Sequence, residues 1–148
     1  MSKLFINTDG GSRGNPGPGA IGVVFFDSEN KIIHTYKECI GTATNNEAEY
    51  TAIIRALDIL SKSSWLKEFD NNGGEVVCRL DSQLVVEQLN GNYKIKQPHI
   101  RDLVDEVESY TDKFTLKISF THIVRELNKI ADKLVNEALD EAKKDGAN

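Results

Sequence analysis

The sequence predicts one α/β domain, with a mixed five-stranded sheet and helices on both of its faces. Three strand-like segments come first, and helical and strand-like segments alternate after them, which is the order typical of α/β proteins. The chain has 148 residues, of which 39% are apolar and 28% are charged. A chain of this length buries enough surface for one sizeable core, so we expect residues 1–148 to form a single domain.

Composition excludes several classes of protein. The chain has no apolar run of about 18 residues and no secretory signal pattern, so we expect a cytoplasmic protein without a membrane partner. The two cysteines, Cys39 and Cys78, lack metal-ligand spacing, and we expect reduced, partly buried thiols within strands. The net charge of −5 is unlike the basic surface of most nucleic-acid-binding proteins, although carboxylates clustered around cations would also lower it.

The first three strands should form a meander. Residues 3–9 begin apolar on both faces, which is typical of a central strand. Residues 10–19 are rich in glycine and proline and predict a turn. Residues 20–27 and 31–40 are predicted as the second and third strands, joined by a tight turn.

A capping box predicts where the first helix begins. Thr44 stands at the N-cap, and Glu47 lies three residues later, where its side chain reaches back to the N-cap backbone. The helix then runs to about Leu60. The polar, turn-rich segment after it should pack down through Trp65 and Leu66.

The remaining elements follow in order: a strand at 75–80, a short helix at 81–89 that residues 90–92 end, an extended basic link at 93–99, a helix at 100–110, a strand at 114–122 and a last helix at 127–144. The fifth strand alternates polar and apolar residues, as a half-buried strand does. The last two helices carry their apolar residues three or four positions apart, which predicts one buried face for each.

Four acidic residues stand at unusual positions. Asp9 ends the first predicted strand and Asp81 ends the fourth. If those strands are parallel neighbours, both side chains emerge where open α/β sheets bind ligands. Glu49 falls within the apolar stripe of its helix, in line with Ile53. Burial of a glutamate is costly unless something pairs with it. Asp132 lies near the start of the last helix, beside its apolar face.

Three of these acids also have an ordinary structural explanation. Asp9 suits a turn before glycines, Asp81 suits a helix N-cap, and Asp132 suits the first turn of a helix. Glu49 has no such explanation, and a single cluster accounts for all four. Carboxylates without cysteine favour Mg²⁺ or Mn²⁺ over zinc. Two such ions about 3.5–4 Å apart can promote phosphoryl displacement.

Four segments carry recognisable motifs: DGGSRGNPGPGA at 9–20, TNNEAE at 44–49, LDSQ at 80–83 and RELNKIAD at 125–132. In content and order they resemble the motifs of type 1 ribonuclease H, and together they span nearly the whole chain. The resemblance implies the ribonuclease H-like fold, with strand order 3-2-1-4-5. It also implies a metal-dependent endonuclease that hydrolyses the RNA strand of RNA–DNA hybrids.

The resemblance assigns roles to residues of this sequence. It implies that two Mg²⁺ ions, or Mn²⁺ as a substitute, are bound by the catalytic acids Asp9, Glu49, Asp81 and Asp132. It implies substrate contacts at Asn15, Thr44, Asn45 and Gln83, and Gly10 and Arg125 are further candidates for contact with the substrate. The three amides match positions that contact RNA sugars and base edges, Thr44 matches a contact to a DNA-strand phosphate, and the loop after Gly10 lets backbone amides approach closely. Contacts of this kind predict weak sequence preference.

The chain departs from parts of that family in two places. The segment at 121–126 replaces a longer loop with a glycine and a catalytic histidine, so we expect His122 to end the fifth strand as a structural residue. Two roles stay open for Arg125, namely contact with the scissile phosphate or an ion pair with a nearby acid. The basic protrusion shrinks to 90–99, which predicts weak, salt-sensitive binding.

Three other functions compete with this one. The first is a non-catalytic module that binds RNA or hybrids on the same fold, and the presence of all four acids argues against it. The second is a nuclease for DNA junctions, which the asparagines suited to 2′-hydroxyls argue against. The third is an interaction domain with coincidental acids, which Glu49 argues against. We expect a monomer.

Overall fold

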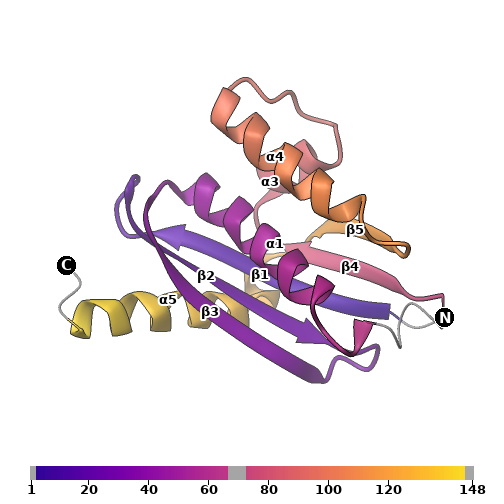
Figure 1. The fold of residues 1–148 in the computed structure, drawn as a ribbon. Coiled ribbons are helices and arrows are strands. Elements are labelled where there is room, and N and C mark those ends of the chain that lie inside the picture. Colours follow the sequence, from indigo (N-terminus) through magenta and orange to yellow (C-terminus); the bar gives the residue numbers. More distant parts are fainter. Residues whose placement is uncertain (1–2, 67–72, 146–148) are drawn as a thin grey trace.

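The computed structural model describes residues 3–66 and 73–145, which form one five-stranded sheet with helices on both faces (Figure 1). The elements in chain order are β1 (Lys3–Ser12), β2 (Gly17–Phe26), β3 (Ile32–Ala43), α1 (Asn45–Ser61), β4 (Glu75–Leu80), α3 (Gln83–Leu89), α4 (Pro98–Thr111), β5 (Lys117–His122), a 3₁₀ turn (Arg125–Leu127) and α5 (Lys129–Lys144). Within these ranges no helix is both long and apolar enough to cross a membrane.

The strand order is β3-β2-β1-β4-β5, which confirms the predicted order. The first three strands pair antiparallel, as a meander should, whereas β1 pairs with β4 and β4 pairs with β5 in parallel. Because β1 and β4 are parallel neighbours, their carboxyl ends lie at the same edge of the sheet. The predicted acidic site required that the strands of Asp9 and Asp81 be parallel neighbours, and the structure shows that they are.

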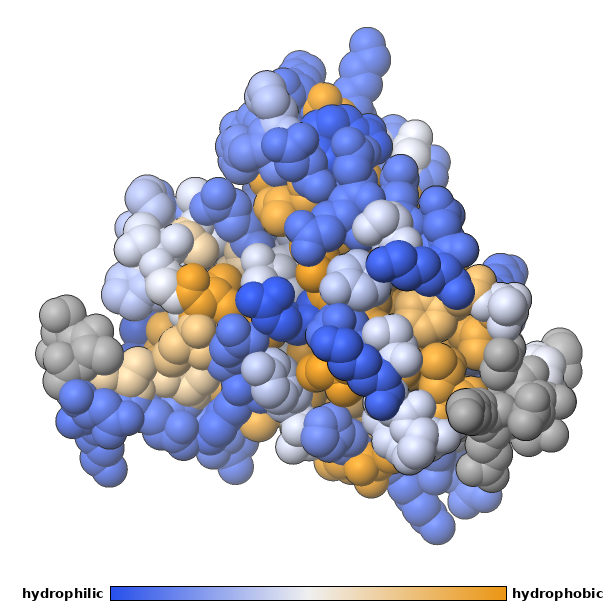
Figure 2. Space-filling view, in the orientation of Figure 1, coloured by the Kyte–Doolittle hydropathy of each residue, from blue (hydrophilic) through white to orange (hydrophobic). Residues whose placement is uncertain are grey.

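Two apolar layers hold the helices against the sheet. The larger core lies between the sheet and α1, and α4 packs outside α1. Trp65 and Leu66 join this core as predicted, and the Trp65 ring meets the edge of Phe25 at 5.1 Å between ring centroids. Smaller clusters around Val24 and Val135 fix α5 against the opposite face. Hydrophilic side chains cover most of the α4 end of the molecule (Figure 2).

Two glycines let the helices approach the sheet closely. A Cβ added at Gly10 would lie 2.2 Å from the carbonyl oxygen of Ala48 in α1. One added at Gly22 would lie 2.3 Å from the carbonyl oxygen of Ala131 in α5. The absence of a side chain at these positions brings the first turns of both helices to the central strands, one on each face.

Gly10→Ala should lower the free energy of unfolding by about 1–3 kcal/mol, because the new methyl group must displace the backbone of α1. The neighbouring Gly11 is a matched control, since its nearest atoms would lie 3.9 Å from an added Cβ. Gly11→Ala should therefore change stability by no more than about 0.5 kcal/mol. Urea unfolding of both variants measures the difference, and equal losses would contradict the close packing of β1 on α1.

Several element boundaries were predicted wrongly around the glycine-rich loop. Strand β1 runs three residues beyond Asp9, and β2 begins at Gly17 rather than at residue 20. Strand β3 runs to Ala43, which pairs with Gly17. Pairing between strands outweighs the turn propensity of glycine and proline here, so the turn is confined to residues 13–16.

Boundaries also differ in the second half of the chain. Ser82 is the N-cap of α3, and its hydroxyl accepts from the backbone N–H of Val85, so the alternative role of Asp81 as a cap is wrong. Helix α4 begins at Pro98, which suits the first turn of a helix. The last helix begins later than predicted, at Lys129, because a 3₁₀ turn precedes it. Strand β5 begins three residues late, at Lys117.

Both cysteines lie in strands as free thiols. Cys78 in β4 is fully buried, and burial raises the pKa of its thiol to about 12. Cys39 is exposed rather than partly buried, because β3 is an edge strand. The capping box of α1 is confirmed, with the Thr44 hydroxyl accepting from the N–H of Glu47 and the Glu47 side chain accepting from the N–H of Thr44.

Candidate active site

A cleft of about 420 Å³ lies at the carboxyl ends of β1 and β4, between the first turns of α1 and α5. The predicted residues that line it are Asp9, Gly10, Asn45, Glu49, Asp81, Arg125 and Asp132. The predicted residues outside its lining are Asn15, Thr44 and Gln83. The sequence motifs thus meet at one place although they are spread over more than 120 positions.

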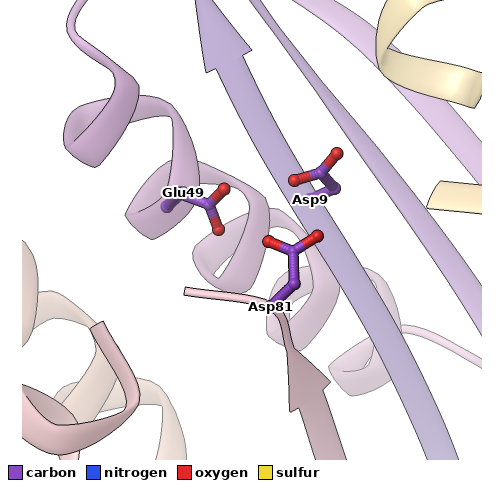
Figure 3. A group of neighbouring side chains, drawn as sticks. All are labelled: Asp9, Glu49 and Asp81. Carbon is purple, nitrogen blue, oxygen red and sulfur yellow. The ribbon is translucent and has the colours of Figure 1, made fainter. Parts of the chain in front are cut away.

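Three acidic side chains converge at the inner end of this cleft (Figure 3). Asp9 follows Thr8, the last residue of β1 that pairs with β4, and Asp81 follows β4 directly. Glu49 reaches them from the first turns of α1. One carboxylate oxygen of each residue lies within 4.8 Å of the others. This spacing suits a shared cation, and the structure therefore brings together three of the four predicted acids.

Glu49 is 7% exposed and only partly satisfied by hydrogen bonds. Its Oε1 accepts from the backbone N–H of Gly10 at 3.4 Å. Its Oε2 is buried without a hydrogen-bond partner among the described residues. Because an unpaired buried oxygen is costly, this atom indicates that the acidic cluster is built to hold a group that the protein alone does not supply. A divalent cation with oxygen ligands fits that requirement.

Burial, together with the charges of neighbouring acids, raises the pKa values of Asp9 and Glu49 in the metal-free protein. Burial is the main cause at Asp9, whose pKa rises from 3.8 to about 7, and the charges of Asp81 and Asp132 add to it. The neighbouring Glu49 carboxyl group and the backbone N–H of Gly10 lower it in part. The pKa of Glu49 is raised well above its ordinary value, first by burial and then by the charges of Asp9 and Asp81. The site therefore binds protons when no cation is present.

In the presence of a chelator, the free energy of unfolding should fall as the pH rises from about 4 to about 7. Across this window the folded protein holds a proton on Asp9 that the unfolded chain has released. The stabilisation is complete below the ordinary pKa of 3.8 and is lost as the pH rises through about 7. Its size is on the order of a few kcal/mol.

Urea unfolding at several pH values measures this slope. Asp9→Asn cannot titrate and is the matched control, so its stability should depend less on pH over the same window. Equal slopes for the two proteins would show that Asp9 is not the residue that binds the proton.

Asp132 stands apart from the other three acids. It lies in the first turn of α5 and lines the cleft from the opposite side, with its side chain exposed. It is outside the group of three whose oxygens lie within 4.8 Å. Its charge still raises the pKa of Asp9, so the two carboxylates face the same space. The predicted cluster of four is therefore a group of three with a fourth acid across the cleft.

The two asparagines link the glycine-rich loop to the start of α1. Asn45 Oδ1 accepts from the backbone N–H of Ser12 at 2.9 Å, and Asn15 Oδ1 accepts from the backbone N–H of Asn45 at 3.0 Å. Each side-chain oxygen thus accepts one hydrogen bond from the backbone, which fixes the orientation of its amide. The NH₂ groups are left for a ligand, and such amides recognise acceptors.

Thr44 and Gln83 lie near the cleft without lining it. The Thr44 hydroxyl oxygen accepts from the backbone N–H of Glu47 at 3.1 Å, so the capping box holds this side chain in place. Gln83 is the first residue of α3 and is exposed, two positions after Asp81. Both helix starts thus present a polar side chain beside the acidic group.

Arg125 lines the cleft from the 3₁₀ turn and is exposed. Among the ion pairs of the described ranges none involves it, so the alternative of an ion pair with a nearby acid is not supported. His122 ends β5, where it pairs with Leu80, and lies outside the cleft lining. Its side chain is exposed, and a structural role for His122 stays a prediction.

Sequence reasoning missed Arg13 and Asn136, which also line the cleft. Arg13 pairs with Asp140 at 2.7 Å, and its guanidinium lies 3.4 Å from Asn136 Oδ1. Asn136 is four residues after Asp132 on α5, and that spacing could have placed it on the same helix face. No local feature of the sequence indicates that Arg13 contacts α5, because the loop after β1 and α5 are far apart along the chain and come together only in the tertiary structure.

Comparison with known proteins connects this site to a family. A family model described as reverse transcriptase-like matches residues 7–138. A bifunctional protein of Mycobacterium tuberculosis is 36% identical over 146 residues, which cover 98% of this chain and 38% of the relative. The ribonuclease HI of Halobacterium salinarum is 40% identical over 134 residues, which cover 90% of this chain and 63% of the relative. The chain thus spans less than two thirds of the length of these two relatives.

Among solved structures, LC11-RNase H1 in complex with an RNA/DNA hybrid superposes with a TM-score of 0.85 and 42% sequence identity. The match covers 94% of this chain and 98% of that one. Both chains are therefore alike over nearly their whole lengths, including the strands and helices that carry the acidic residues.

Proposed function

This chain belongs to the ribonuclease H family, and from that premise we propose that it hydrolyses the RNA strand of RNA–DNA hybrids. The observation that carries the proposal is the convergence of Asp9, Glu49 and Asp81 in an open cleft. The presence of an RNA/DNA hybrid in the crystals of a relative that is 42% identical supports the choice of substrate.

The acids are the proposed ligands of two Mg²⁺ ions, with Mn²⁺ as a possible substitute. Asp9, Glu49 and Asp81 offer closely spaced oxygens, and Asp132 offers one from across the cleft. The all-oxygen donor set and the unpaired Oε2 of Glu49 both fit a hard cation. When bound, such ions activate a water molecule and stabilise charge on the leaving oxygen.

The polar residues around the cleft are the proposed substrate contacts. Asn15, Asn45 and Gln83 would donate from their amides to acceptors of the ribose and of the base edges. Thr44 would contact a phosphate of the DNA strand, and Arg125 would contact the scissile phosphate. Such contacts distinguish RNA by its 2′-hydroxyl and give weak sequence preference.

We propose that residues 1–148 act as one catalytic domain and as a monomer. One continuous sheet through all five strands supports a single domain. The four acids and the cleft that they line are contributed by a single chain, which is compatible with a monomer.

Cleavage of a labelled RNA–DNA hybrid, beside matched double-stranded RNA and double-stranded DNA, tests the function. Cleavage of the RNA strand of the hybrid alone, dependent on added Mg²⁺ and lost in Asp81→Asn, is the expected result. Binding of the hybrid without cleavage under any metal would instead support the non-catalytic module. Cleavage of double-stranded DNA would support the nuclease for DNA junctions.

Gln83→Ala and Asn45→Ala should each lower kcat/KM for the hybrid by about 2–10-fold, because each removes a hydrogen bond worth about 0.5–1.5 kcal/mol. The effect should be larger for Asn45, since its side chain also holds the backbone of Ser12. Deoxyribonucleotides at the contacted positions should reproduce the loss in the wild type. Unchanged kcat/KM in both variants would remove these residues from the substrate contacts.

A further inference from the structure

Asn128 is a buried polar residue where β1, β4 and α5 meet, and these are three of the four elements that carry the acids. It precedes α5, is 1% exposed, and has no part in the roles assigned so far. We infer that Asn128 is a positioning residue that aligns Asp81 with Asp9 and Asp132. The inference rests on the proposed metal site and adds a residue that determines its geometry.

The contacts of Asn128 reach every acid-bearing element except α1. Its Nδ2 donates to the backbone carbonyl of Thr8, the residue before Asp9, at 2.9 Å. The same nitrogen donates to Asp81 Oδ2 at 3.3 Å. Its backbone carbonyl accepts from the N–H of Asp132 at 3.1 Å. One amide side chain therefore uses both of its protons to join the ends of β1 and β4 at the start of α5.

The backbone of Asn128 also joins this arrangement to the 3₁₀ turn. Its N–H donates to the carbonyl oxygen of Arg125 at 2.9 Å. The residue thus lies between the two cleft-lining residues of this segment, Arg125 before it and Asp132 after it. A shift of Asn128 would move both of them relative to Asp81.

Stability alone does not explain this use of the side chain. An asparagine at a helix N-cap ordinarily accepts a hydrogen bond from the first turn of its helix. Asn128 makes no such side-chain cap, and its Oδ1 is buried without a partner among the described residues. The side chain therefore does not cap α5 and leaves its Oδ1 unpaired, while its Nδ2 donates to one oxygen of Asp81. Local costs of this kind are typical of functional sites.

Holding Asp81 matters because its carboxylate follows a strand end and has two oxygens. The bond from Asn128 engages Oδ2 and thereby sets the orientation of the whole group. The other oxygen, Oδ1, is then free to bind a cation. Because the side chain is already held in place, it loses little conformational freedom when the cation binds. Residues that orient metal ligands in this way typically contribute about 10–100-fold to metal affinity.

Asn128→Ser separates positioning from stability. Serine can cap α5 but cannot donate to both Thr8 and Asp81, so the helix should keep its stability while Asp81 loses its support. Mn²⁺ binding without substrate, measured by calorimetry, should weaken by about tenfold. For cleavage of the hybrid, kcat should fall by a similar factor while KM changes by less than about twofold. Asn128→Ala, which lacks both donor and cap, should weaken Mn²⁺ binding to the same extent.

The double variant with Asp81→Asn completes the test. If Asn128 acts through Asp81, Asn128→Ser should change Mn²⁺ affinity by less than about twofold in that background. Wild-type Mn²⁺ affinity in both single variants of Asn128 would overturn the inference and leave the proposed function intact. No Mn²⁺ or Mg²⁺ binding by the wild type, and no cleavage, would instead contradict the proposed function itself.

Discussion

Asp9→Asn should abolish cleavage of the RNA–DNA hybrid and, in EDTA at neutral pH, raise the melting temperature of the protein. Asp9 is 8% exposed and shares its surroundings with Asp81 and Asp132. Asparagine keeps the shape of the side chain and removes one charge from this group. The metal-free protein therefore gains stability, at about 2–4 °C for each kcal/mol recovered.

The same change should remove the response of the protein to metal. A cation that binds only the folded state stabilises it by mass action, so Mg²⁺ should raise the melting temperature of the wild type more than that of the variant. Loss of the central ligand should lower kcat by roughly 10³-fold or more. A variant that is more stable than the wild type in EDTA, yet inactive in Mg²⁺, is the result expected of a site whose carboxylates repel one another when no metal is bound.

Thermal unfolding in EDTA and then in Mg²⁺, beside the hybrid-cleavage assay, measures both effects. Asp105→Asn is a matched control, because Asp105 is an exposed residue of α4 that pairs with Arg101. It should retain cleavage and change the melting temperature little. An Asp9 variant that is less stable in EDTA, or that still cleaves, would make Asp9 a structural residue and overturn the acidic site.

Arg125→Ala should lower kcat in Mg²⁺ by about tenfold or more and leave the fold intact. Arg125 is exposed at the cleft and is not tied to an acid in the described part of the chain, so its guanidinium can approach phosphate. Stabilisation of charge that develops in the transition state is a large term in catalysis. Arg125→Lys should recover only part of the rate, because an ammonium group cannot reproduce the two-pronged contact of a guanidinium.

Steady-state kinetics and circular dichroism of the two variants test this role. Arg101→Ala provides the control, since Arg101 lies on α4 and pairs with Asp105 and Glu108 outside the cleft. It should turn over like the wild type. Wild-type turnover by Arg125→Ala would reduce Arg125 to a surface residue without a part in the reaction.

Local signals in the sequence predicted most of the fold. The capping box placed the start of α1 correctly because its two hydrogen bonds join residues three positions apart. Strand β4 was predicted with its observed bounds, since a short apolar run rich in valine follows a turn-rich segment there. The ends of β1 and β2 were wrong because pairing with another strand decided them, and no local signal carries that pairing.

The candidate site divides in the same way. The sequence by itself identified the candidate residues for the chemistry. Asp9 and Asp81 stand at the ends of predicted strands, and Glu49 stands on an apolar stripe of its helix. The capping box and the glycines shape the segments around them. These features depend on neighbours within one turn or one strand. The family resemblance added the pairing of β1 with β4, from which the convergence of the acids follows.

Only the tertiary structure decided the distances. It placed Asp132 across the cleft from the other three acids, and it brought Arg13 and Asn136 to the rim. It also placed Asn128 between β1 and β4, where its amide reaches both. The physical reason is that the gap between two elements is set by how closely they pack. Here α1 and α5 approach the sheet at Gly10 and Gly22, and no pattern within either helix contains that distance.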